Sequence, residues 1–186
     1  MRRSALFNLL SVGFLSLVSI TIAGCCCCCG DTSGINLPSP AELPPEIQLI
    51  VDELEADDHY VTVENGKVTG IDIGSKDKTP ALLEKLPKLS TLVSLTMNDM
   101  NLNDEDLDHI QSLTNLEMLE LYGNNLTGAS LDRLNGMQRL SHLDLDGNPI
   151  TDESMVHVSN LSNLATLYLN STEVTDAGIA KLQNHA

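Results

Sequence analysis

Two consecutive stretches decide the fold of this chain: residues 116–139, LEMLELYGNNLTGASLDRLNGMQR, and residues 140–163, LSHLDLDGNPITDESMVHVSNLSN. Aligned without gaps, both place an apolar residue at positions 1, 4, 6, 11, 16, 19 and 22. The pattern continues into 92–115, 164–186 and 68–91, and 33 of the 35 such positions in the five units are apolar. A fixed period of this length indicates a repeat architecture, in which each unit buries its apolar face against its neighbours.

Each 24-residue unit predicts a strand followed by a helix. Positions 4 and 6 alternate with outward positions 3, 5 and 7, which is typical of a short strand with one buried face. Positions 16, 19 and 22 recur at helical spacing, and Thr or Asn followed by Asp at positions 12 and 13, as in Thr151-Asp152, supplies N-cap chemistry. We therefore expect an α/β solenoid with a parallel sheet on its concave face, named the sheet face below, and helices on its convex face.

The units resemble the leucine-rich repeat family, whose strand pattern is L-x-x-L-x-L-x-x-N-x-L. One copy of that pattern is formed by Leu116, Leu119, Leu121, Asn124 and Leu126. The second half of each unit is similar to the T-D-x-G-L variant of short bacterial members, most clearly at 175–179. Three units carry another residue at the asparagine position of this pattern: Lys76, Met100 and Thr172. Because the asparagine satisfies backbone groups at the turn, we expect a looser turn near Met100.

Residues 1–24 predict a signal peptide, because two arginines precede an apolar stretch that ends in small residues. The segment Ile22-Ala23-Gly24-Cys25 resembles the bacterial lipobox, which implies that Cys25 is lipidated and becomes the N-terminus of a surface lipoprotein. An uncleaved membrane anchor is the alternative. Either anchor predicts a location in the cell envelope, outside the cytoplasm. Cys26 to Cys29 fit sequence drift in a linker, extra acylation or metal capture.

The predicted domains are the signal peptide, a lipidated and proline-rich tether at 25–45, an N-terminal cap at 46–67 and the repeats at 68–186. The repeats divide into 68–91, 92–115, 116–139, 140–163 and 164–186. The cap is expected as an amphipathic helix and a hairpin that turns at Asn65-Gly66. No comparable cap follows the last unit in this sequence, so we expect its apolar residues to be exposed.

Charge and motif content exclude several classes of function. The chain has 10 Lys and Arg against 26 Asp and Glu, and the part beyond residue 24 carries −18 because Arg2 and Arg3 precede it. Nucleic acid and anionic lipid surfaces repel such a protein. All five cysteines lie in 25–29, and no nucleophile, phosphate-binding or zinc motif occurs. A calcium loop at 99–110 fails because it lacks the required glycine and final glutamate. We predict no enzyme activity, no metal and no cofactor.

We predict that the sheet face binds an unknown protein or peptide. The carboxylates and tyrosines of this face suit a basic partner. Its candidate residues are Met118, Glu120, Tyr122, His142, Asp144, Asp146, Tyr168 and Asn170, with Thr166 beside them. The alternative is that this face binds no partner and is simply the solvated surface of an acidic protein. The alternative function is a self-assembling envelope protein, a weak homo-oligomer that pairs through the uncapped last repeat.

Overall fold

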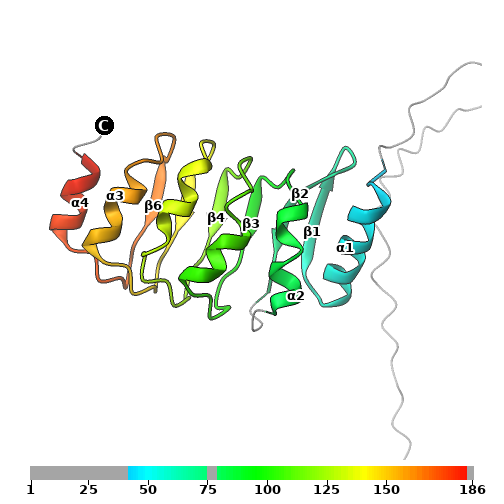
Figure 1. Cartoon of the computed structure of the whole chain (residues 1–186), viewed down its shortest axis with the longest axis horizontal. Helices are drawn as coiled ribbons and strands as arrows, with labels where there is room; N and C mark the ends of the chain where they lie inside the picture. The colour runs from blue at the N-terminus through cyan, green and yellow to red at the C-terminus, as the bar shows by residue number, and fades with distance from the viewer. Residues whose placement is uncertain (1–41, 75–78, 184–186) are drawn as a thin grey trace, which may run out of the picture. The chain divides into compact units, whose positions relative to one another are not determined.

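The computed structural model describes residues 42–74 and 79–183, and the folded part is built on one six-stranded sheet (Figure 1). The strands follow the chain in the order β1-β2-β3-β4-β5-β6. Their bounds are β1 Tyr60–Glu64, β2 Lys67–Asp72, β3 Ser94–Thr96, β4 Met118–Glu120, β5 His142–Asp144 and β6 Thr166–Tyr168. β1 is antiparallel to β2, and every later neighbour pair is parallel. The expected parallel sheet is therefore present.

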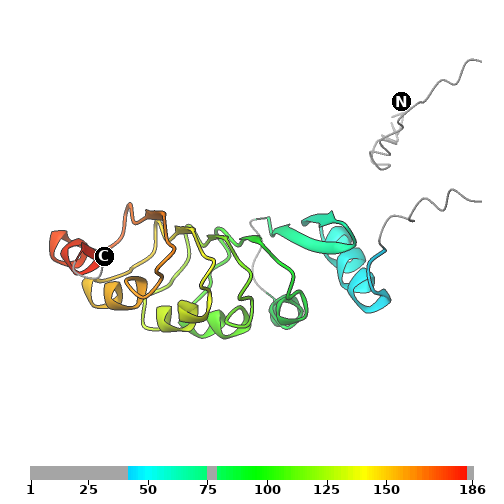
Figure 2. The same ribbon diagram turned by 90° about the horizontal axis from the view of Figure 1, so that it is seen from above.

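The connections between strands carry short helices that lie on one side of the sheet (Figure 2). The α-helices are α1 Pro45–Ala56, α2 Pro80–Leu83, α3 Met155–Val158 and α4 Asp176–Gln183. The 3₁₀ helices are η1 Leu86–Lys88, η2 Asp104–His109, η3 Leu131–Gly136 and η4 Asp152–Ser154. A 3₁₀ helix has three residues per turn, which fits apolar residues at positions 16, 19 and 22, but α3 and α4 carry the same spacing as α-helices. Our prediction of helices was therefore correct in place but too general in type.

The strands repeat with the period of the sequence. Leu95, Leu119, Leu143 and Leu167 pair in register across β3 to β6, each 24 residues from the last. Every one of the seven apolar positions in 92–115, 116–139 and 140–163 is at most 5% exposed. These side chains belong to one continuous core, which extends to Ile50, Val51 and Leu54 of α1. The core is almost wholly aliphatic, so its stability comes from close packing of methyl-rich side chains.

Two buried asparagines bind the turn of the preceding unit as well as their own. The Asn124 side-chain oxygen accepts hydrogen bonds from the backbone N–H groups of Met100 and Leu102, both at 3.0 Å. Its amide nitrogen donates to the carbonyls of Met97 at 2.8 Å and Leu121 at 2.9 Å. The N–H groups of Met100 and Leu102 are therefore bonded and both side chains are buried, so our expectation of a looser turn there was wrong. The signal was misread because the asparagine of the next unit supplies the bonds.

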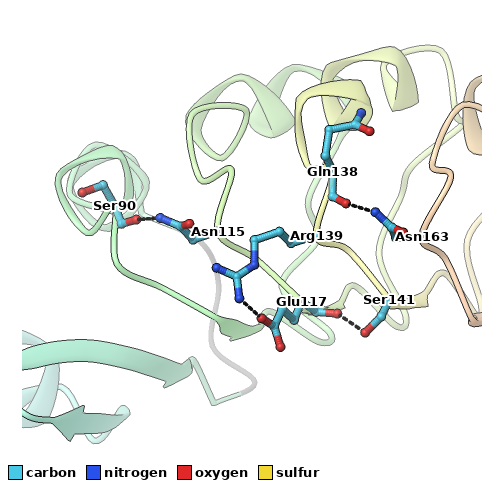
Figure 3. A network of polar contacts seen from close by, with 7 residues as sticks. All are labelled: Ser90, Asn115, Glu117, Gln138, Arg139, Ser141 and Asn163. Atoms are coloured by element: carbon cyan, nitrogen blue, oxygen red, sulfur yellow. Dashed lines mark hydrogen bonds and ion pairs between the residues drawn. The ribbon is translucent and has the colours of Figure 1, made fainter.

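A second set of polar contacts joins the units at the edge where the strands begin (Figure 3). Asn115 donates its side-chain amide to the carbonyl of Ser90, at 2.9 Å, and Asn163 donates to the carbonyl of Gln138. The Ser141 hydroxyl donates to the carbonyl of Glu117, whose side chain forms an ion pair with Arg139. Because that ion pair is exposed, its charges contribute little to the stacking of the units.

Aspartates at position 13 connect units on the helix side. The carboxylate of Asp104 accepts hydrogen bonds from the Thr127 hydroxyl at 2.6 Å and the Ser130 hydroxyl at 3.0 Å. Burial raises the pKa of Asp104, but these hydrogen bonds outweigh burial and leave it below its ordinary value. Asp152 binds the backbone N–H and hydroxyl of Thr175 in the same way, both at 2.7 Å, and these bonds lower its pKa. The Asp at position 13 thus also binds the following unit.

Candidate functional site

The strand register collects the predicted side chains into rows on the sheet face. Glu120, Asp144 and Tyr168 are direct neighbours across β4, β5 and β6. Met118 and His142 are neighbours in the same way, next to Thr166. Since Leu119 and Leu143 between them are buried and Leu167 is partly buried, these side chains point away from the core. Neighbouring strands lie about 4.8 Å apart, so the carboxylates of Glu120 and Asp144 share one small surface.

Each carboxylate of this surface already accepts a hydrogen bond within the protein. Glu120 accepts from the Asn98 side-chain amide at 3.2 Å and from the Thr96 hydroxyl at 3.4 Å. Asp144 accepts from the backbone N–H of Asp146 at 2.9 Å. A carboxylate has about four acceptor positions, so both groups keep positions for a further donor. Both side chains are held in place by these bonds rather than free to rotate.

Burial raises the pKa of Asp144, and the negative charges of Asp146 and Glu120 raise it further. The hydrogen bond from the Asp146 backbone and the positive form of His142 act in the opposite direction, and the net shift is upward. The raised pKa means that burial and the neighbouring negative charges disfavour the ionised form of Asp144 in the free protein. A cationic group placed here would therefore stabilise the ionised form.

The residues just after the strands play a different part. Asp146 accepts hydrogen bonds from the backbone N–H of Asn170 and, at 2.8 Å, from its side-chain amide. Asn98 likewise accepts from the backbone N–H of Tyr122, at 2.8 Å. Asp146 and Asn170 thus join consecutive units through these bonds. Asp144 and Glu120 are therefore more available to bind a partner than Asp146 is.

Aromatic and sulfur-containing side chains frame the acidic pair. Tyr122 is 46% exposed, Tyr168 is 41% exposed and Met118 is 39% exposed. The rings of His142 and Tyr168 lie 5.4 Å apart between centroids and are inclined by 59°. Large side chains that keep two fifths of their surface in water, on a rigid sheet, provide apolar contact area with little entropy to lose on binding.

Sequence reasoning missed Tyr60, which is 77% exposed and lies opposite Asp72 at the β1 end of the same face. Counting back from the Asn65-Gly66 turn pairs Tyr60 with the buried Ile71. A bulge between Thr62 and Val63 shifts the register by one residue, and a shift of one moves a side chain to the other face. All three tyrosines of the chain therefore lie on the sheet face. No turn signal in the sequence reveals the bulge.

Other predicted features stay untested or lie elsewhere. Cys25 and residues 26–41 of the predicted tether fall outside the described residues, whereas Pro45, its last residue, begins α1. Within residues 42–74 and 79–183, no three His, Cys, Asp or Glu side chains are grouped so that they could hold a metal ion. None of the helices in these ranges is long and apolar enough to cross a bilayer.

Comparison with known proteins agrees with this architecture. Residues 90–150 match the family model of the leucine rich repeat. An internalin of Listeria monocytogenes, inlF, is similar with a TM-score of 0.53 at 30% sequence identity, covering 61% of this chain and 32% of the internalin. Internalin C2 of the same species gives a TM-score of 0.53 at 23% identity, covering 75% of this chain and 61% of the internalin. No curated protein sequence matches the chain.

These matches confirm the predicted leucine-rich repeat fold and support the leucine-rich repeat family for this chain. The match to internalin C2 bears on the fold alone. This chain spans less than two thirds of either internalin.

Proposed function

We propose that this leucine-rich repeat solenoid is a non-enzymatic, membrane-tethered binding module outside the cytoplasm, which holds a basic protein or peptide on its sheet face. The observation that carries the proposal is the row Glu120, Asp144 and Tyr168, which three neighbouring strands hold in register. Carboxylates beside an exposed tyrosine are suited to a lysine or arginine side chain, through an ion pair and a cation–π contact together.

The charge of the whole protein favours the same class of partner. The part beyond residue 24 carries −18, and long-range attraction of this size raises the rate at which a basic partner arrives. The tether of 25–45 would hold the sheet face at a distance from the membrane, and Cys25 would anchor it there. Binding is then expected to weaken as salt is added, because part of the attraction is screened.

The test uses the full chain, immobilised in detergent, and a displayed library of random twelve-residue peptides. We expect enriched peptides to be rich in Lys and Arg, and to bind at least about tenfold more weakly after Glu120→Gln and Asp144→Asn are combined with Tyr168→Ala. The matched control is Asp132→Asn, which removes one exposed carboxylate from η3 on the helix side. Peptides that bind all these variants equally would place the site on another surface.

A second candidate function is self-association through the last repeat, and the burial of its apolar residues favours it. Leu164, Leu167, Leu169, Val174 and Leu182 are only partly buried, whereas the matching residues of the middle units are fully buried. A hollow of about 260 Å³ opens beside Leu161, Leu164, Leu167 and Leu182. In the described part of the chain, no strand covers the outer edge of β6. Light scattering of the full chain in detergent against its Leu167→Asp variant tests this, and equal particle masses at all concentrations would refute it.

A further inference from the structure

A hollow of about 350 Å³ lies at the β1 end of the sheet face, separate from the acidic pair. Its lining includes Tyr60, Thr62 and Glu64 of β1, Gly70 and Asp72 of β2, and Thr96 of β3. Gly70 occupies the position at which β4 carries Met118 and β5 carries His142. The missing side chain opens the hollow, and a Cβ at Gly70 would already lie 3.3 Å from Thr62.

The walls of this hollow combine aromatic, small and acidic groups. Tyr60 forms one wall, and Asp72 lies directly opposite it across the β1–β2 pair. Glu64 also borders the hollow, but it pairs in register with Lys67, so Asp72 is the better carboxylate for an incoming cation. An aliphatic stem fits against the small side chains and the tyrosine ring, while a charged head reaches Asp72. Lysine and arginine are the side chains that have this form.

The spacing between the hollow and the acidic pair fits one extended chain. Asp72, Thr96, Glu120 and Asp144 are consecutive neighbours in one row of the sheet. Asp72 and Asp144 are three strand spacings apart, about 14 Å. In an extended peptide, residues i and i+4 point to the same side and lie about 13 Å apart. Thr96, between the two sites, is small and leaves the path across the strands open.

We propose that the hollow at Tyr60 and Asp72 is a second subsite for a lysine or arginine, and that the sheet face binds an extended peptide segment with basic residues at i and i+4, lying across the strands. This inference rests on the proposed function and adds the spacing and direction of the partner. The first basic residue occupies the hollow and the second pairs with Asp144 and Glu120, or the reverse.

The experiment measures binding of labelled synthetic peptides to the full chain in detergent, by fluorescence anisotropy. The probes are nine-residue glycine–serine peptides with two arginines at i,i+2, i,i+3 or i,i+4, and one with a single arginine. We expect the i,i+4 peptide to bind at least about threefold more tightly than either other two-arginine peptide. Equal affinities across the three spacings would overturn the inference.

Variants assign the effect to the hollow. Tyr60→Ala should weaken the i,i+4 peptide about tenfold, to the level of the single-arginine peptide, and Asp72→Asn should weaken it severalfold. Both residues are exposed, so the fold should survive both changes, and circular dichroism checks this. Asp132→Asn is again the control and should leave affinity unchanged.

The outcomes separate the two proposals. The second subsite is refuted, while the proposed function stands, if the peptides bind more weakly to the Glu120 and Asp144 variants but equally well to the Tyr60 and Asp72 variants. If none of the two-arginine peptides binds the full chain, both are refuted.

Discussion

Replacing Asn124 with alanine should be among the most destabilising single changes in this protein. The substitution leaves the buried N–H groups of Met100 and Leu102 without their side-chain acceptor and removes a donor from the carbonyl of Met97. The carbonyl of Leu121 keeps a partner, since Asn148 also donates to it at 2.9 Å.

The expected loss follows from the number of buried groups that become unbonded. A buried group without a partner costs about 1–3 kcal/mol. Asn124→Ala removes the acceptor that two buried N–H groups share. At about 2 kcal/mol for each group, the free energy of unfolding should fall by about 4 kcal/mol. That is a large part of the total of about 5–15 kcal/mol that ordinary domains have. The measurement is urea unfolding of the full chain, followed by far-ultraviolet circular dichroism.

Two matched variants make the result specific. Asn125→Ala makes the same chemical change at the next, exposed residue and should cost less than about 0.5 kcal/mol. Thr172→Ala removes a side chain that bonds only within its own unit and should cost about 1 kcal/mol. A loss below about 1 kcal/mol for Asn124→Ala, or one no larger than that for Thr172→Ala, would show that the asparagine does not support the preceding turn.

Three further predictions concern the anchor, acid stability and the last unit. Cys25→Ala should release the protein from membranes or leave an uncleaved precursor, as seen by fractionation and mass spectrometry; a variant processed like the parent would disprove lipidation. Because the folded pKa of Asp104 lies below its ordinary value of 3.8, its bonds stabilise the fold above that pH and are lost as pH falls through the folded pKa. The destabilisation caused by Asp104→Asn should therefore shrink between about pH 5 and about pH 3 in urea titrations, and a constant difference would count against the contact with Thr127. In hydrogen exchange, the amide of Leu167 should be less protected than that of Leu119, and equal protection in a monomeric sample would mean a closed end.

The period of the sequence was sufficient to predict the solenoid, the parallel sheet and the buried positions. Leucines at fixed 24-residue steps have one consistent arrangement, in which each packs on its equivalent in the next unit. The acidic pair of Glu120 and Asp144 followed from the same register. What the pattern did not contain were effects between units, such as the bonds from Asn124 to the turn at Met100.

Tyr60 shows a second limit. Its face depends on a single bulge in the hairpin, and the choice between two registers is made by packing: the shifted register brings Val61 opposite Ile71 and turns Tyr60 to solvent. Local turn chemistry is the same in both registers, so the sequence pattern alone could not select one. The hollow over Gly70 was unpredictable for the same reason.

The buried asparagines bond to the turn of the preceding unit, so the repeat array has a direction. This direction matters when units are gained or lost by recombination. If residues 116–139 were removed, the unit after Met100 would carry Asn148 in place of Asn124. The turn at Met100 would then keep a side-chain acceptor. Removing 140–163 would instead place Thr172 behind Leu126, whose N–H now bonds to Asn148 at 3.1 Å. Two deletions of equal length thus differ, because one keeps a side-chain acceptor for the preceding turn and the other removes it from the N–H of Leu126.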